Sequence, residues 1–213
     1  MKSGGKTWLA MCAWPALCSL VASALHPTDW DWQPALAASE PWRWWSAAFV
    51  HWSAAHLAAN LVALALVATL GAVATVPLVI TLAWLASWPL LHLGLLVQPE
   101  LAHYGGLSGL VHSGVAVVAV FVAVTEGGAR RAIGVAMLVG LAIKITLEAP
   151  WAAAPPLSIS ADVPVAPMVH LSGAVTGLLC TLLALARGPL VHTEPELEPV
   201  PSDSPSTAKA ETS

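Results

Sequence analysis

The feature that most constrains this chain is a long interval with almost no charge. Between Arg43 and Glu126 the sequence carries one formally charged side chain, Glu100. Over all 213 residues only 9% are charged and 57% are hydrophobic, whereas a soluble domain has about 25% charged residues. Such a chain cannot cover itself with a solvated surface. The sequence therefore predicts an integral membrane protein in contact with the lipid bilayer.

Six apolar runs are long enough to cross the hydrocarbon core, which needs about 20 residues per helix. They cover residues 7–25, 50–71, 76–97, 106–125, 132–149 and 166–187. Lipid leaves no backbone group unpaired, and no segment alternates like a barrel strand. We therefore expect an all-α bundle of six transmembrane helices over residues 1–187. Residues 188–213, rich in Pro, Glu and Ser, are predicted to form a disordered cytoplasmic tail.

The basic residues of the short loops predict the orientation of the bundle. Lys2 and Lys6 precede the first run, Arg130 and Arg131 join the fourth and fifth, and Arg187 ends the sixth. With six crossings all three sites fall on one side, the cytoplasm, and Arg43 alone contradicts this. The second, fourth and sixth helices then run from outside to inside. The first run, ending in Ala22-Ser23-Ala24, also resembles a secretory signal, so its retention stays open.

The connection 26–49 carries a cluster of tryptophans. Its members are Trp30, Trp32, Trp42, Trp44 and Trp45. Because tryptophan favours the membrane–water interface, we expect this loop to lie on the membrane surface. We expect His92 and His103, near the following outer loop, to be solvated.

The unusual polar and glycine residues gather near the starts of the second, fourth and sixth runs. They are His51, His56 and Asn60; Gly106, Ser108, Gly109 and His112; and His170 and Gly173. Because the three helices run in the same direction, these residues share one depth, within about 15 Å of the outer surface at a rise of 1.5 Å per residue. Polar residues inside membrane spans are expensive and usually functional. The pattern predicts one site built from three helices.

The residue types at this depth suit acyl transfer. A serine attacks a carbonyl only if a base takes its proton, and histidine is the usual base. The oxyanion that forms needs donors already in place, and His56 and Asn60, four residues apart, point from one helical face. Gly173 and Gly177 form a small-residue face. Packing that face on the fourth helix would bring His170 to Ser108.

These motifs, in this order, resemble the rhomboid intramembrane proteases over about residues 40–187. The resemblance is carried by Trp42-Arg43, His51, His56, Asn60, Gly106-Leu107-Ser108-Gly109 and His170-Leu171-Ser172-Gly173. It implies that Ser108 is the nucleophile and His170 the general base. It also implies that His56, Asn60 and the backbone amide of Ser108 hold the oxyanion, and that His51 is structural. The implied substrate is a membrane-anchored protein. No basic run suggests a nucleic-acid partner, and we expect no metal site and no cofactor.

Two departures from the common rhomboid pattern resemble the rhombosortase branch. His112 occupies the position where many rhomboids stack a tyrosine on the catalytic histidine, and Lys144 and Glu148 form an i,i+4 pair on the fifth span. We expect this pair to neutralise itself in lipid. The branch is implied to process proteins with a C-terminal Gly-Gly sorting segment. We therefore expect the protein in the bacterial inner membrane, with its active site towards the periplasm.

Other interpretations stay open at this point. His112 can itself be the base, one turn from Ser108. The chain can be an inactive rhomboid-like protein that binds transmembrane clients, or a membrane haem protein that uses the histidines. The loop 150–165 is a candidate gate. Whether the acyl group passes to water or to another nucleophile is also open.

Overall fold

The computed structural model describes residues 3–25, 29–98, 101–151 and 166–188. Its long helices are α1 (Ser3–Leu25), α3 (Ala54–Val73), α4 (Leu78–Leu90), α5 (Ser108–Thr125), α6 (Gly128–Glu148) and α7 (Pro167–Ala186). Short helices are η1 (Pro34–Leu36), α2 (Arg43–Ser46), η2 (Ala47–Phe49) and η3 (Leu91–Val97). In the described ranges the extended structure is a single bridge between Trp32 and Tyr104. The expected tail after residue 188 and most of the expected gate lie outside these ranges.

The all-α membrane bundle predicted from the sequence is confirmed, and the six long helices agree with the six expected spans. Five helical stretches are long and apolar enough to cross a membrane: Gly4–Leu25, Ala54–Val73, Leu78–Val97, Ser108–Thr125 and Pro167–Ala186. The sixth helix, α6, is long enough but carries Arg130, Arg131, Lys144 and Glu148. Within the stretch Leu78–Val97 the helix type changes, because α4 ends at Leu90, one residue after Pro89, and η3 continues from Leu91. Proline has no amide hydrogen and its ring disturbs the preceding turn.

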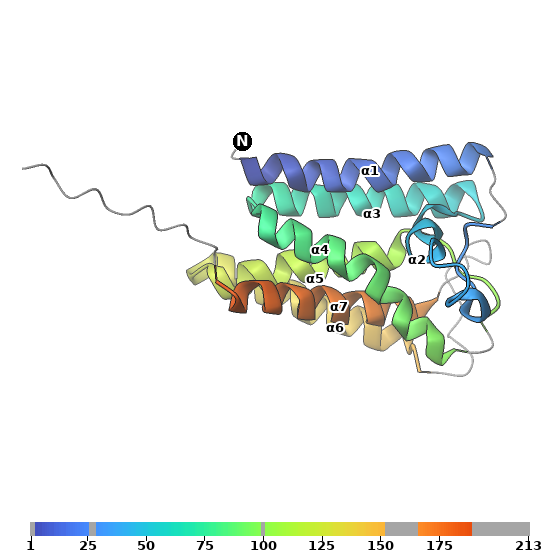
Figure 1. Ribbon diagram of the computed structural model, residues 1–213. Helices are drawn as coiled ribbons and strands as arrows, with labels where there is room; N and C mark the ends of the chain where they lie inside the picture. The colour runs from blue at the N-terminus through green and yellow to red at the C-terminus, as the bar shows by residue number, and fades with distance from the viewer. Residues whose placement is uncertain (1–2, 26–28, 99–100, 152–165, 189–213) are drawn as a thin grey trace, which may run out of the picture.

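The helices α3, α5 and α7 begin at one end of the bundle, the end at which α2 lies (Figure 1). The chain passes along the bundle twice between the starts of α3 and α5, and twice again between the starts of α5 and α7. All three helices are therefore expected to begin at the same end. The polar residues at the three helix starts therefore share one level, as the sequence predicts.

Helix α5 packs on α7 through glycines, as expected. A Cβ on Gly173 would collide with the carbonyl oxygen of Gly109, and one on Gly177 would lie 2.6 Å from the carbonyl oxygen of Ser113. The two backbones can approach this closely only because neither glycine has a side chain. The small-residue face of α7 thus sets the distance between the two helices.

Helix α1 is part of the packed bundle. The Trp8 side chain is fully buried and stacks on Trp84, with ring centroids 4.5 Å apart. Its indole nitrogen donates to the carbonyl oxygen of Val67 at 3.1 Å. Gly71 leaves the space that this indole fills, because a Cβ there would overlap the Trp8 ring.

The tryptophan-rich loop is folded and buries one of its five tryptophans, while its position on the membrane surface stays a prediction. Trp32 is fully buried and its ring contacts Trp44 and His92, each with centroids 4.7 Å apart. His92 is also fully buried, so the expectation that it is solvated was wrong. The ring contact with Trp32 covers the imidazole in place of water. Trp42 and Trp45 remain exposed and fit the interfacial role.

Arg43, the one basic residue that disagrees with the predicted orientation, is buried in the same loop. Its Nη1 donates to the carbonyl oxygen of Asp31 at 2.7 Å and to Oδ1 of Asp31 at 3.0 Å. Its Nε pairs with Oε2 of Glu40 at 2.5 Å. Because its charge is neutralised inside the folded loop, Arg43 carries little information on orientation.

Candidate active site

Ser108 is the first residue of α5 and is half-buried. The segment before it is held by backbone hydrogen bonds between Trp32 and Tyr104, at 2.7 and 2.8 Å, and by the Gly106 amide, which donates to Ala47 at 3.0 Å. Gly106 has a φ of +126°, a conformation that residues with a Cβ rarely adopt. The local turn thus requires glycine two residues before Ser108.

Tyr104 is a residue of this site that the sequence analysis missed. Its hydroxyl donates to the carbonyl oxygen of Gly106 at 2.9 Å and interacts with the side chain of Ser108 and the amide of Gly109. Burial raises the pKa of the Tyr104 phenol to about 12, so the hydroxyl is protonated at neutral pH. Its position four residues before Ser108, as the one tyrosine of the chain, was the available signal.

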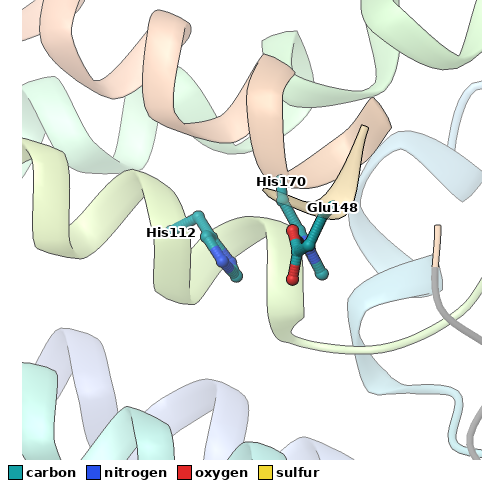
Figure 2. Close-up of side chains that lie close together, drawn as sticks. All are labelled: His112, Glu148 and His170. Carbon is teal, nitrogen blue, oxygen red and sulfur yellow. Dashed lines mark hydrogen bonds and ion pairs between the residues drawn. The ribbon is translucent and has the colours of Figure 1, made fainter. Parts of the chain in front are cut away.

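His170 lies in the first turn of α7 and is buried. Its Nδ1 is 2.7 Å from Oε2 of Glu148, the last residue of α6. Its ring stacks on that of His112, with centroids 4.0 Å apart and an interplanar angle of 11°. Figure 2 shows these three side chains together, from three different helices. The stacking expected for His112 by resemblance is therefore present.

His112 also contacts the residue that carries the serine. Its Nδ1 lies 2.6 Å from the carbonyl oxygen of Ser108. Because a carbonyl oxygen only accepts, this nitrogen carries the ring proton. The other nitrogen of His112, Nε2, is then the basic one.

The contact between α5 and α7 brings the neighbourhoods of Ser108 and His170 together. A Cβ on Gly109 would lie 2.8 Å from Cγ2 and 3.4 Å from the carbonyl oxygen of Val169. Gly109 and Val169 are the sequence neighbours of Ser108 and His170. The two helix starts thus meet at the position that the sequence predicts.

His56 and Asn60 face the turn before Ser108. A Cβ on Gly106 would lie 2.8 Å from Nε2 of His56 and 3.7 Å from Nδ2 of Asn60. Both side chains are buried on α3, whose start is capped by the Ser53 hydroxyl, which accepts from the His56 amide at 3.1 Å. The Asn60 amide group donates one hydrogen to the carbonyl oxygen of His56 at 3.1 Å. Its second hydrogen can serve another acceptor.

His51 lies in the loop just before α3 and contacts His56. Its Nδ1 lies 3.1 Å from the carbonyl oxygen of Phe49. Its ring packs edge-on against the His56 ring, with centroids 4.9 Å apart. His51 also lines, with Ser23 of α1, a cavity of about 450 Å³ at the start of α3. The structural role expected for His51 stays a prediction.

Lys144 and Glu148 form the expected ion pair on α6, between Nζ and Oε1. The bond from the second carboxylate oxygen to His170 was not expected. Counting crossings places the end of the fifth span at the same end of the bundle as Ser108. The number of crossings is therefore the feature of the sequence that points to Glu148.

Within the described part of the chain, three potential metal ligands lie together, with ligand atoms of His112, Glu148 and His170 within 4.8 Å of one another. An imidazole binds a metal ion in the plane of its ring, at about 2.0–2.1 Å for zinc. Two nearly parallel rings 4.0 Å apart cannot both contain one ion in their planes. The arrangement therefore suits ring stacking and hydrogen bonding, and it does not fit a shared metal ion.

The fold and the site define a multi-pass helical membrane protein with serine and histidine side chains gathered at one end of the bundle. A family model for the Rhomboid domain matches residues 38–187, a range that contains Ser108, His170 and the candidate oxyanion residues. The chain belongs to the rhomboid family, which comprises intramembrane serine proteases. No match was found among curated proteins.

Proposed function

We propose that this protein is an intramembrane serine endopeptidase in which Ser108 is the nucleophile and His170 the general base. The observation that carries the proposal is the contact of α5 with α7. Gly109 meets Val169 there, and His112, one turn after Ser108, stacks on His170. A nucleophile and a base from two helices need this kind of close approach.

In the proposed reaction the Ser108 hydroxyl attacks the scissile carbonyl carbon while its proton passes to His170. His56, Asn60 and the backbone amide of Ser108 donate to the oxyanion. The carbon–nitrogen bond then breaks, and His170 gives the proton to the leaving amine. Water releases the acyl group from Ser108 in a second round of the same steps. A sorting reaction would replace this water by another nucleophile.

The substrate is proposed to be a membrane-anchored protein whose apolar segment enters from the lipid. We propose that the segment enters beside α6. This helix packs on α5 through Gly134, where a Cβ would lie 2.9 Å from the carbonyl oxygen of Ala119. Most other side chains of α6 are exposed in the bundle. The basic residues at the opposite helix ends support placing the site on the periplasmic side of a bacterial inner membrane.

Two features support the rhombosortase branch: His112, in place of the common tyrosine, and the Lys144–Glu148 pair. We therefore propose substrates with a C-terminal Gly-Gly segment, an apolar span and a basic tail. A purified reporter with this ending, and a matched reporter with Ala-Ala in place of Gly-Gly, test the specificity. Preferential cleavage of the Gly-Gly reporter is expected. Equal cleavage of both would overturn the branch assignment and leave the protease assignment intact.

Covalent labelling tests the nucleophile. A fluorophosphonate probe is expected to label the wild-type protein in detergent and to fail on Ser108→Ala. Ser39→Ala, at an exposed loop serine, is the matched control and should label like the wild type. A wild-type protein that is not labelled and does not cleave would favour an inactive, client-binding rhomboid-like protein.

The base is tested with two histidine variants. His170→Ala is expected to abolish cleavage while the unfolding transition of the bundle stays close to that of the wild type. His112→Ala should keep measurable cleavage, because its ring only stacks on the base in the proposed site. Normal cleavage by His170→Ala would transfer the base assignment to His112.

A further inference from the structure

We infer that Glu148 is a positioning residue for His170, so that the site is a Ser108–His170–Glu148 triad instead of a serine–histidine pair. This inference rests on the proposed function. The geometry that carries it is the 2.7 Å contact from Oε2 of Glu148 to Nδ1 of His170. The two residues lie on different helices, at the end of α6 and the start of α7.

The hydrogen bond selects one tautomer of His170. An ionised carboxylate only accepts, so Nδ1 of His170 donates the proton to it. Nε2 is then the basic nitrogen that can take the proton of Ser108. When His170 becomes positively charged during the reaction, the carboxylate at Nδ1 stabilises that charge.

The His170 ring is fixed on two sides. Glu148 holds one edge through Nδ1, and His112 covers one face at a centroid distance of 4.0 Å. His112 is itself held by the 2.6 Å bond from its Nδ1 to the carbonyl oxygen of Ser108. A ring held by both an edge contact and a face contact loses little freedom when it reacts.

Lys144 lowers the energetic cost of placing this carboxylate at the edge of the membrane. It pairs with Oε1 of Glu148, so an otherwise isolated negative charge is compensated. If the pair only neutralised charge within α6, one carboxylate oxygen would be sufficient. The second oxygen instead contacts a histidine on another helix, which is the arrangement that a triad needs.

Three variants test the inference in full-length protein with a cleaved reporter. Glu148→Gln keeps the shape but removes the charge, and we expect kcat to fall at least about 100-fold with KM changed less than about threefold. Glu148→Asp keeps the charge on a shorter side chain and should recover part of the lost rate. Glu126→Gln is the matched control, since Glu126 also forms an i,i+4 pair, with Arg130 at 3.3 Å. Its kcat should equal that of the wild type.

A spectroscopic measurement tests the same contact without catalysis. In ¹⁵N-histidine-labelled protein, the signals of His170 are assigned by their loss in His170→Gln. The wild type should show His170 protonated at Nδ1, and Glu148→Gln should shift protons to Nε2, because the new amide group can donate. An unchanged tautomer in a folded Glu148→Gln protein would overturn the inference.

The outcomes separate the two proposals. If the wild type labels at Ser108 and Glu148→Gln cleaves within about threefold of the wild-type kcat, the triad is overturned and the protease stands. If the wild type neither labels nor cleaves, the proposed function falls and the triad falls with it as a catalytic device. If Glu148→Gln unfolds, the kcat of Glu148→Asp tests the triad instead. A reduced kcat supports the triad, and a wild-type kcat contradicts it.

Discussion

Two charged clusters near the end of the bundle at which α5 and α7 begin have the same parts and different exposure. In each, a carboxylate contacts a basic side chain with one oxygen and a histidine Nδ1 with the other. Asp31 pairs with Arg43 at 3.0 Å and with His103 at 2.6 Å. Glu148 pairs with Lys144 and, at 2.7 Å, with His170. The chemistry alone does not tell the two clusters apart.

Burial distinguishes them. In the loop cluster the Asp31 and Arg43 side chains are 3% and 4% exposed, whereas the histidine, His103, is 58% exposed. In the α6–α7 cluster the order is reversed, because His170 is 7% exposed and Glu148 is 23% exposed. The first cluster therefore holds a carboxylate and an arginine that join parts of a loop. The second holds a buried histidine through its Nδ1, as the proposed triad requires.

Arg43→Leu should give the largest effect on stability. Removing one partner of a buried ion pair costs about 3–5 kcal/mol, because Asp31 would stay buried without its main partner. The free energy of unfolding in detergent, measured with a denaturant series, checks this value. A change below about 1 kcal/mol would show that the loop cluster is no more structural than an exposed pair.

Gly173→Ala should come next, since it affects the helix packing beneath the His170 contact. The added methyl group would meet the backbone of Gly109, and overpacking of this kind costs about 1–3 kcal/mol. We expect cleavage to fall together with the free energy of unfolding. Gly140→Ala on α6, where a Cβ meets no atom within 4 Å, is the matched control and should leave both unchanged or slightly improved.

Glu148→Gln should change the free energy of unfolding by about 1 kcal/mol or less, because the carboxylate is partly exposed and solvent can replace part of the lost interaction. Its effect on cleavage is expected to be far larger than its effect on stability. A denaturant series and the reporter assay on the same preparation make the comparison. A loss of stability comparable to that of Arg43→Leu would assign the second cluster a structural role.

His103→Gln should have the smallest effect, about 0.5 kcal/mol or less on unfolding, because a contact made by an exposed side chain contributes little. Since Arg43 still neutralises Asp31, the buried carboxylate keeps its main partner. Thermal unfolding in detergent gives the value, and cleavage should stay at the wild-type rate. A large loss would mean that His103 holds the loop as firmly as Arg43 does.

Much of the bundle and the central part of the site could be predicted from the sequence. Helix starts follow from apolar runs, and the parity of the crossings places Ser108 and His170 at one level. The glycines of α7 predict which helix it meets, because close backbone approach needs residues without side chains. These inferences use only length, direction and local composition.

Contacts between distant segments could not be predicted in this way. The Glu148–His170 bond depends on how far α6 extends and on its rotation against α7, which a run of apolar residues does not determine. The burial of Trp32 and His92 depends on a loop whose Trp32 packs against His92 of η3. Arg43 was treated as an exception to the charge rule because its partner, Asp31, lies 12 residues earlier in a segment without a regular pattern.

The backbone bridge between Trp32 and Tyr104 has a consequence for measurements of local opening. Each residue donates its amide hydrogen to the carbonyl oxygen of the other, so both amides should exchange with deuterium at similar, slow rates. A ligand or antibody that pulls the N-terminal loop away would accelerate both amides at once. Deuterium uptake at Trp32 would thereby report, from a distant part of the chain, whether the turn that leads into Ser108 is intact.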